Sequence, residues 1–394
     1  MTPPTAGRDD RIDALRGLAL LGILLVNIQS FAWGGANPAG YLLDDATPLD
    51  RALFFLTVAF VNVKFMPLFA MLFGAGFSLL LAKLRNLTSE PHAVFRRRMA
   101  FLFAFGMLHG VLLYFGDITQ MYALAGIVLL AYDGHGLGRL RRAVVLWWAG
   151  ALALNVLLTW ATAGSVPDPA DLAAELEGNF AVFTGLGYLG QLPTRASLFF
   201  DIVLANLIGL PMAVALMLTG MLAQRSGWLV DPGARAWRVA LAIGIVIGLP
   251  ASLAYGVLLY VEADAYGLGG YSALAALPGA ISSTLAFAYA ALFFRNAPPA
   301  LVRWLAPAGR MPLTNYLLQS MLMGALLSGW GLALAPVLGY SETALLALAI
   351  FAGQVLLSRW WIARFGQGPL ERIWRQWTYR GMPPLQDAPI RTGE

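Results

Sequence analysis

The sequence predicts an all-α, polytopic membrane protein: a bundle of about ten transmembrane helices followed by a C-terminal amphipathic helix. Hydrophobic residues make up 59% of the 394 positions, and charged residues make up only 12%. Soluble globular domains contain about 25% charged residues, so a water-soluble fold is excluded. Apolar stretches of membrane-spanning length recur throughout the chain, and the loops between them alternate between basic and acidic. The chain is therefore expected to cross a bilayer many times.

The expected helices follow from the lengths of the apolar stretches. A membrane span needs about 20 predominantly apolar residues, and about ten stretches approach that length. The fourth is the shortest, and the second is long enough to tilt or to break at Pro67. The expected spans are residues 14–33, 52–81, 99–115, 118–132, 143–161, 200–223, 237–260, 272–294, 312–337 and 343–362.

Loop charges test this segmentation independently. The basic segments are residues 8–11, 83–98, 139–142, 225–235, 295–310 and 364–391, and the intervening loops are acidic. Because basic loops stay on the cytoplasmic side, this alternation places both termini in the cytoplasm. The sequence therefore divides into a cytoplasmic segment (1–13), a transmembrane domain (14–362) and a cytoplasmic tail (363–394).

Two segments outside the spans carry patterns of their own. Residues 163–198 form the long outer loop, in which residues 169–177 are expected to form a short acidic helix. This loop would serve as a lid, as an acceptor-binding loop or as a plain connector. In the tail, Pro369 is typical of a helix start. The apolar face of the predicted amphipathic helix, which would lie on the inner membrane surface, consists of Leu370, Ile373, Trp374 and Trp377.

Composition also excludes several kinds of site. The chain has no cysteine, which rules out a disulfide, a thiol nucleophile and a Cys-ligated metal. The three histidines make no metal-ligand spacing, so no metal is expected, and His92 and His135 are expected to be solvated in basic loops. The net charge of +5 is confined to loops, which fits an anionic membrane face and no nucleic acid partner. The first apolar run lacks a signal-peptide exit, so we expect no cleavable signal peptide.

Four polar side chains stand at membrane depth: Asn27, Lys64, His109 and Asp117. An ionisable side chain there costs about 2.5 kcal/mol or more, which favours a functional role over structural pairing or snorkelling. The expected topology places His109 about 16 Å above Arg98 along its helix, and Asp117 in the outer turn that follows. Asn27, His109 and Asp117 are therefore expected to converge in a pocket that opens to the outer face.

The chemistry of these groups suggests roles for them. A neutral His109 could remove a proton from an acceptor hydroxyl or amine, and Asp117 could fix its tautomer. Lys64, near mid-membrane, could neutralise a thioester oxygen or pair with a carboxylate. At the inner end of the first helix, Asp13 and Arg16 are three residues apart, which suits either an anchoring ion pair or a ligand role.

Three regions of the chain resemble the YeiB-like family, also called domain of unknown function 418. One contains Asp13-x-x-Arg16-Gly17, and another contains Gly106-x-x-His109 followed by Asp117. The resembling stretches are residues 11–27, 64–76 with 97–98 and 106–123, and 309–316 with 365–374. Through its first helix this family is similar to the transmembrane acyltransferases, which include acyltransferase family 3 and heparan-α-glucosaminide N-acetyltransferase.

This resemblance implies that the bundle moves an acyl group from cytoplasmic acyl-CoA to a glycan, lipid or other small acceptor at the outer face. It places the CoA phosphates on basic side chains at the inner face, namely Arg16, Arg98 and Arg310. Family 3 enzymes carry a histidine where this chain has Asn27. His109 is therefore expected to act as the general base, with Asn27 as a donor to the oxyanion.

The alternative function is a transporter or flippase for a small or lipid-linked substrate. Proline interrupts the expected spans at Pro67, Pro211 and Pro250, which suits a moving carrier. A non-catalytic scaffold or sensor is the third interpretation. In each case the expected location is the bacterial inner membrane, with the lipid bilayer as partner and a homodimer left open.

Overall fold

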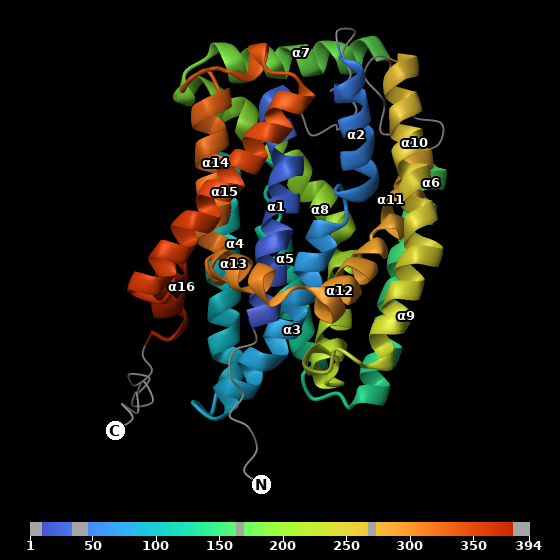
Figure 1. Ribbon diagram of the computed structural model, residues 1–394, viewed down its shortest axis with the longest axis vertical. Helices are drawn as coiled ribbons and strands as arrows, with labels where there is room; N and C mark the ends of the chain where they lie inside the picture. The colour runs from blue at the N-terminus through green and yellow to red at the C-terminus, as the bar shows by residue number, and fades with distance from the viewer. Residues whose placement is uncertain (1–9, 34–45, 163–168, 267–272, 381–394) are drawn as a thin grey trace.

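The computed structural model describes residues 10–33, 46–162, 169–266 and 273–380, and this part of the chain contains no β-strand. Its helices form an elongated bundle in which most axes follow the long dimension of the molecule, and α7 crosses one end (Figure 1). Seven helical segments of the described chain are long and apolar enough to cross a membrane. The chain is a multi-pass membrane protein, and the count of ten spans stays a prediction.

At least one helix lies within each of the expected spans. Their bounds are α1 Asp10–Trp33, α2 Pro48–Phe60, α3 Phe65–Arg85, α4 Pro91–Leu112, α5 Thr119–Leu129, α6 Leu137–Thr162, α7 Pro169–Gly185, α8 Tyr188–Arg225, α9 Arg235–Ile243, α10 Leu249–Tyr266, α11 Ala273–Ser282, α12 Leu285–Asn296, α13 Pro299–Arg310, α14 Pro312–Leu327, α15 Tyr340–Phe365 and α16 Pro369–Thr378. Short non-α turns are η2 Leu130–Tyr132, η3 Trp228–Val230, η4 Gly244–Gly248 and η5 Ala335–Val337.

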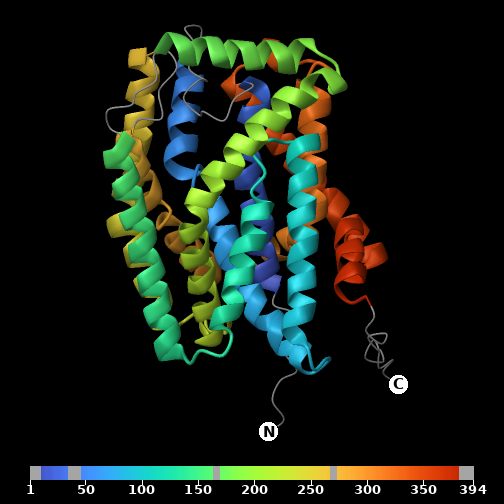
Figure 2. The same ribbon diagram turned by 180° about the vertical axis from the view of Figure 1, so that it is seen from behind.

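The two ends of the bundle differ in charge. At the end where α1, α4, α6 and α9 begin and where α3 and α8 finish lie Arg11, Arg85, Arg225 and Arg235. At the opposite end, where α7 lies and where α2 and α15 begin, are Asp50, Asp171, Glu175 and Glu342. Figure 2 shows the same arrangement from behind. We call these the basic end and the acidic end.

The second expected span is two helices and not one. α2 stops at Phe60, residues 61–64 form a turn, and α3 starts at Phe65. A proline ring conflicts with the carbonyl four residues earlier, which for Pro67 belongs to Val63. Val63 has φ of 51°, a strained value for a β-branched residue. The break therefore precedes Pro67, which lies in the first turn of α3, where its missing N–H is tolerated.

The eighth expected span is also split, between α11 and α12. The hydroxyls of Ser282, Ser283 and Thr284 each donate to the carbonyl three residues earlier, at 2.7, 2.7 and 2.8 Å. Such local bonds compete with the helical ladder and favour a turn. Three consecutive hydroxyl residues thus account for a discontinuity that apolar length alone does not reveal.

The expected outer loop, residues 163–198, is largely helical. It consists of α7, which is longer than the short helix expected, and the first turns of α8; residues 163–168 lie outside the described chain. α14 ends at Leu327, earlier than expected, and the loop after it packs against the end of α7. There the N–H of Gly329 donates to the carbonyl of Phe183 at 2.8 Å.

Small residues let the central helices touch backbone to backbone. A Cβ built on Gly74 of α3 would lie 1.8 Å from the Met217 carbonyl oxygen of α8, and one on Gly309 of α13 would lie 1.7 Å from that of Asp13 in α1. Any side chain at these positions would push the helices apart. Close approach of this kind is characteristic of packing between membrane helices.

The C-terminal helix α16 packs on the bundle as well as presenting an exposed face. Trp374 is buried, its ring stacks on Phe101 of α4 at 6.3 Å, and its Nε1–H donates to the Arg98 carbonyl at 3.0 Å. Ile373 and Trp377 remain exposed. The predicted apolar face is therefore divided between the protein and the surroundings.

Candidate functional site

The turn between α4 and α5 positions a carboxylate against an imidazole. His109 lies in the last turn of α4, and Asp117 follows in the turn before α5. Asp117 Oδ1 accepts hydrogen bonds from the backbone N–H and the hydroxyl of Thr119, both at 2.7 Å. Asp117 Oδ2 lies 2.8 Å from His109 Nδ1. One oxygen thus anchors the carboxylate to its own turn, and the other orients the ring.

Gly106 makes this approach possible. A Cβ at Gly106 would lie 2.4 Å from Thr119 Oγ1 and 2.9 Å from Asp117 Oδ1. The spacing Gly106-x-x-His109 therefore puts the glycine and the histidine on one face of α4, where the turn crosses it. Gly110 has a different role, because its Cβ would meet the ring of Phe199 in α8.

The other imidazole nitrogen meets a serine that sequence reasoning did not select. His109 Nε2 lies 2.9 Å from Ser320 Oγ of α14, and Ser320 Oγ lies 3.4 Å from the Tyr316 carbonyl. An ionised carboxylate only accepts hydrogen bonds, so we assign the proton to Nδ1 and the lone pair to Nε2. The shorter contact is then the Ser320 hydroxyl donating to His109 Nε2.

These three side chains form a continuous chain of contacts, from hydroxyl to imidazole to carboxylate. The signal for Ser320 in the sequence is weak, because serine is common in apolar helices. A better signal in the sequence is the spacing of four between polar residues, Asn315 with Gln319 and Tyr316 with Ser320. The structure buries all four side chains. Asn315 and Gln319 are bonded to Ser358 and Gln354 of α15, at 3.0 and 2.9 Å.

Aromatic rings enclose the imidazole. The Phe105 ring is parallel to it at 5.6 Å, the Tyr316 ring lies at 4.9 Å and the Tyr114 ring at 6.4 Å. Ser320 is 1% exposed, and the side chains of His109 and Asp117 are 1% and 0% exposed. The site is closed in this structure, which differs from the open pocket that we expected. Burial in a low dielectric strengthens its hydrogen bonds.

Asn27 lies on the side of α1 that faces this cluster. One turn further along α1, Ser30 Oγ is 3.5 Å from the Tyr114 hydroxyl, and Phe31 stacks on the Tyr114 ring at 5.1 Å. Asn27 is buried on the same helix, one turn closer to the basic end. Within the described chain no hydrogen bond joins it to His109 or Asp117.

Lys64 occupies a different place, at the break between α2 and α3. It is fully buried, its Nζ donates to the Val58 carbonyl at 3.0 Å, and it lies 5.3 Å from the centre of the Tyr255 ring. The described residues form no ion pair with it. Two carbonyls near the end of α2 therefore have side-chain donors. The Val58 carbonyl accepts from Lys64, and the Phe60 carbonyl accepts from the Tyr289 hydroxyl at 2.8 Å.

The three arginines expected to bind CoA lie near one another at the basic end. Arg16 pairs with Asp13 at 2.8 Å and donates to the Gly309 carbonyl at 3.3 Å. Arg310 lies 3.5 Å from the same Asp13 and also bonds Asp10. Asp13 thus ties α1 to α13, which fits the anchoring role considered for the Asp13–Arg16 pair.

Arg98 contacts the C-terminal helix. Its guanidinium carbon lies 3.5 Å from the centre of the Trp374 ring. Glu371 in the same helix α16 caps the start of α14, because its Oε1 accepts from the N–H of Leu313 and of Thr314 at 2.7 and 3.1 Å. The segments 309–316 and 365–374 are therefore joined in space.

A second charged cluster at the basic end was not expected. Asp133 Oδ2 lies 2.5 Å from Arg85 and 2.8 Å from His92 Nε2, and its Oδ1 lies 3.1 Å from Arg225. The His92 side chain is 45% exposed, as expected for a solvated residue, and its bond to Asp133 also joins the α4 start to the α5–α6 turn. Partial burial raises the pKa of Asp133, but the hydrogen bonds from His92 and Arg85 outweigh it and hold the pKa below its usual value.

The described residues contain no group of three or more His, Cys, Asp or Glu that could hold a metal ion.

Comparison with known proteins identifies the family. YeiB of Escherichia coli (strain K12) is 32% identical over 403 residues, covering 96% of this chain and 98% of the relative. The chain belongs to the YeiB-like DUF418 family. The family described as "Protein of unknown function (DUF418)" matches residues 223–381. These contain Ser320 but neither His109 nor Asp117.

Two further relatives of this DUF418 protein cover nearly its whole length. YxaH of Bacillus subtilis (strain 168) is 26% identical over 95% of both chains, and a 39.9 kDa protein from the amylase 3' region of Bacillus acidopullulyticus is 29% identical over 96% of both. No solved structure matches the chain at a significant level.

Proposed function

We propose that this protein is a transmembrane acyltransferase in which Ser320, His109 and Asp117 act as nucleophile, general base and orienting carboxylate. The observation that carries the proposal is the line of two short contacts, 2.9 Å from Ser320 Oγ to His109 Nε2 and 2.8 Å from His109 Nδ1 to Asp117 Oδ2. A hydroxyl on a base that a third group orients is the arrangement that activates a weak nucleophile. Burial of all three groups supports chemistry protected from water.

The proposed reaction has two balanced steps. His109 Nε2 takes the Ser320 proton while Oγ attacks the thioester carbonyl of acyl-CoA, and the C–S bond breaks as the imidazolium returns the proton to the thiolate. In the second step an acceptor hydroxyl or amine gives its proton to His109 and attacks the acyl-serine ester. Ser320 regains its proton, and the acyl group leaves on the acceptor.

Other parts of the chain have supporting roles in this proposal. Asn27, which is buried on α1, would donate its amide to the oxyanion. Arg16, Arg98 and Arg310 supply positive charge for the CoA phosphates at the basic end, which the positive-inside rule assigns to the cytoplasm. The proposal gives Lys64 no role in the reaction, and its contacts are at the α2–α3 break. The acceptor would enter from the acidic end, on the outer face of the bacterial inner membrane.

The test is covalent labelling of the full chain in proteoliposomes. Acetyl-CoA and palmitoyl-CoA, each labelled in the acyl group, are added, and acid-quenched protein is examined for an ester that hydroxylamine removes. We expect the label on Ser320, and a labelling rate about 10²–10⁴-fold lower in His109→Ala, which is the usual contribution of a general base.

A buried serine elsewhere in the bundle provides the matched control. Ser78 of α3 is buried and has no hydrogen-bond partner within the described chain. Ser78→Ala should label normally, whereas Ser320→Ala should not label. A stable ester on Ser320→Ala, or an unchanged rate in His109→Ala, would contradict the proposal.

The two broken helices favour a second candidate, a lipid flippase. Discontinuous spans near a buried cation are typical of carriers, and Lys64 lies in one of these breaks, between α2 and α3. Proteoliposomes without CoA that flip a fluorescent phospholipid, and lose this activity in Lys64→Met but not in Ser320→Ala, would favour this candidate over acyl transfer.

A further inference from the structure

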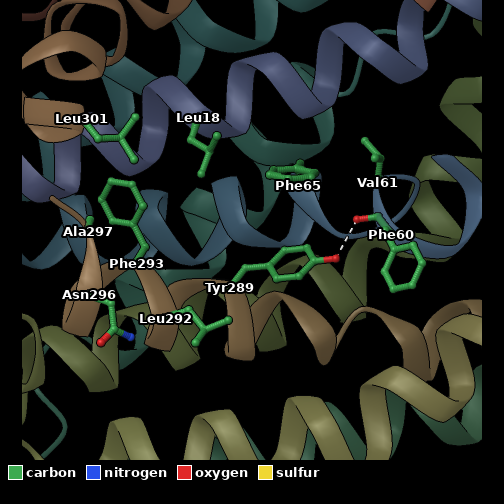
Figure 3. A pocket seen from close by; sticks show the side chains of 10 residues that line it. All are labelled: Leu18, Phe60, Val61, Phe65, Tyr289, Leu292, Phe293, Asn296, Ala297 and Leu301. Carbon is green, nitrogen blue, oxygen red and sulfur yellow. Dashed lines mark hydrogen bonds between the residues drawn. The ribbon is translucent and has the colours of Figure 1, made fainter. Parts of the chain in front are cut away.

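An apolar groove lies between α1, the α2–α3 break, α12 and α13 (Figure 3). Its volume is about 410 Å³, within the range of pockets that hold small organic ligands. Leu18, Phe65, Leu292 and Leu301 supply its apolar walls. The Tyr289 hydroxyl, which also lines it, points at the Phe60 carbonyl and bonds it at 2.8 Å, as the dashed line in Figure 3 shows. The groove therefore offers an apolar surface to an occupant.

A charged cavity of about 290 Å³ adjoins this groove, and Ala297 lines both. Arg11 and Arg303 line the charged cavity together with Asp10. Arg310 bonds the Asp10 carboxylate, so this acid is already compensated. The Arg303 side chain is exposed, and no described carboxylate pairs with it. The cavity therefore favours an anion.

The two cavities follow the direction of the bundle. Arg11 is at the start of α1, and Leu18 is seven residues further along, which corresponds to about 10 Å of helix rise. The charged cavity is thus at the basic end, and the apolar groove extends from it toward the middle of the bundle as far as the α2–α3 break. Leu292 is 48% exposed on a membrane protein, so the groove opens toward surrounding lipid.

We propose that these two cavities together bind one anionic phospholipid of the leaflet at the basic end. The phosphate lies between Arg11 and Arg303, and one acyl chain fills the groove along Leu18 and Leu292. Basic side chains close to a membrane surface attract anionic lipid, and the apolar area of the groove that the acyl chain covers adds to the affinity. A zwitterionic lipid lacks the net charge that this end would select.

The test uses a photoactivatable phosphatidylglycerol, with the reactive group near the end of one acyl chain, in liposomes that contain the full chain. Cross-linked peptides are then mapped. We expect labelling in α1 and α12 at least about fivefold above that of the matching phosphatidylcholine probe, the factor typical of one basic side chain beside anionic lipid. Equal labelling by both probes would overturn the proposal.

Two substitutions separate the groove from the charged cavity. Leu292→Trp should fill the groove and reduce labelling there, whereas Leu345→Trp, at a 66% exposed leucine of α15, should not. Arg303→Glu should remove the preference for phosphatidylglycerol, whereas Arg139→Glu, at an exposed arginine at the start of α6, should preserve it. Elution of each variant as a monodisperse peak shows that it is folded.

The same measurement distinguishes a lipid from the acyl donor. Unlabelled phosphatidylglycerol should compete with the probe, and palmitoyl-CoA at the same concentration should not. Competition by palmitoyl-CoA alone, or labelling that Leu292→Trp and Arg303→Glu both leave unchanged, would overturn the proposal.

Discussion

Asp117 Oδ2 lies 2.8 Å from His109 Nδ1, and the two residues are eight positions apart along the chain, at the turn that connects α4 to α5. The other carboxylate oxygen is held by Thr119, so the acid has a single orientation. His109 Nε2 in turn lies 2.9 Å from Ser320 Oγ, which is the contact that the proposed proton transfer would use.

Asp117→Asn should preserve the shape of the turn and reduce acyl transfer. An amide can accept one hydrogen bond from Thr119, but it cannot stabilise an imidazolium, so we expect a loss of about 10²–10⁴-fold in the rate of Ser320 acylation. The measurement is the initial labelling rate at saturating acyl-CoA. Asp231→Asn, at an exposed loop position, is the control. A normal rate in Asp117→Asn would remove the carboxylate from the mechanism.

Gly106→Ala should be destabilising, whereas Gly76→Ala should be nearly neutral. The new Cβ at Gly106 would lie 2.4 Å from Thr119 Oγ1, and one at Gly76 would meet no atom within 4 Å. Overpacking of a tight contact costs about 1–3 kcal/mol. Thermal unfolding in detergent, followed by light scattering, should show a lower midpoint for Gly106→Ala alone. Equal midpoints for the two variants would mean that the α4–α5 turn accommodates the added methyl group without loss of stability.

Glu371→Ala should destabilise the contact between α16 and α14. The substitution removes the carboxylate that accepts from the Leu313 and Thr314 N–H groups at the start of α14. Loss of a helix cap costs about 0.5–2 kcal/mol. Limited proteolysis should cut near α16 sooner in Glu371→Ala than in the wild type. Glu175→Ala in α7 is the control, and equal cleavage of both variants would contradict the capping role.

The contribution of Asp133 to stability should depend on pH in a defined window. Its pKa in the folded protein is below the ordinary value near 3.9, so its ion pairs stabilise the fold fully above that pH. The stabilisation is lost as pH falls below about 3.9 through the folded pKa. Hydrogen bonds to a buried charged group contribute about 1.5–3 kcal/mol, which Asp133→Asn should remove.

The measurement for Asp133 is the difference in unfolding midpoint between the wild type and Asp133→Asn. This difference should be constant from pH 7 to pH 5 and should shrink only below about pH 4. A difference that disappears already between pH 7 and pH 5 would contradict this contribution of the Asp133 carboxylate.

Local sequence patterns were enough to predict where most helices lie, because apolar length and loop charge are properties of adjacent residues. The break before Pro67 was within reach, since proline conflicts with the carbonyl of Val63 four residues earlier. The split after Ser282 was harder to foresee, because hydroxyl back-bonding competes only weakly with a helix. The site was foreseen only in part: His109 and Asp117 are eight residues apart, whereas Ser320 is 211 residues from His109.

From composition and spacing alone, this chain is identified as a lipid-embedded helical bundle with polar groups that burial makes costly. Both features follow from the free-energy cost of moving polar groups out of water. That cost depends on the type of each residue and on its neighbours along the chain. Which polar groups meet is a matter of helix packing. α14 comes beside α4 and brings Ser320 to His109, while Lys64 faces α10, so one predicted group of residues separates into two places. Contacts between distant segments arise from the complementary shapes of whole helices, and no local pattern encodes them.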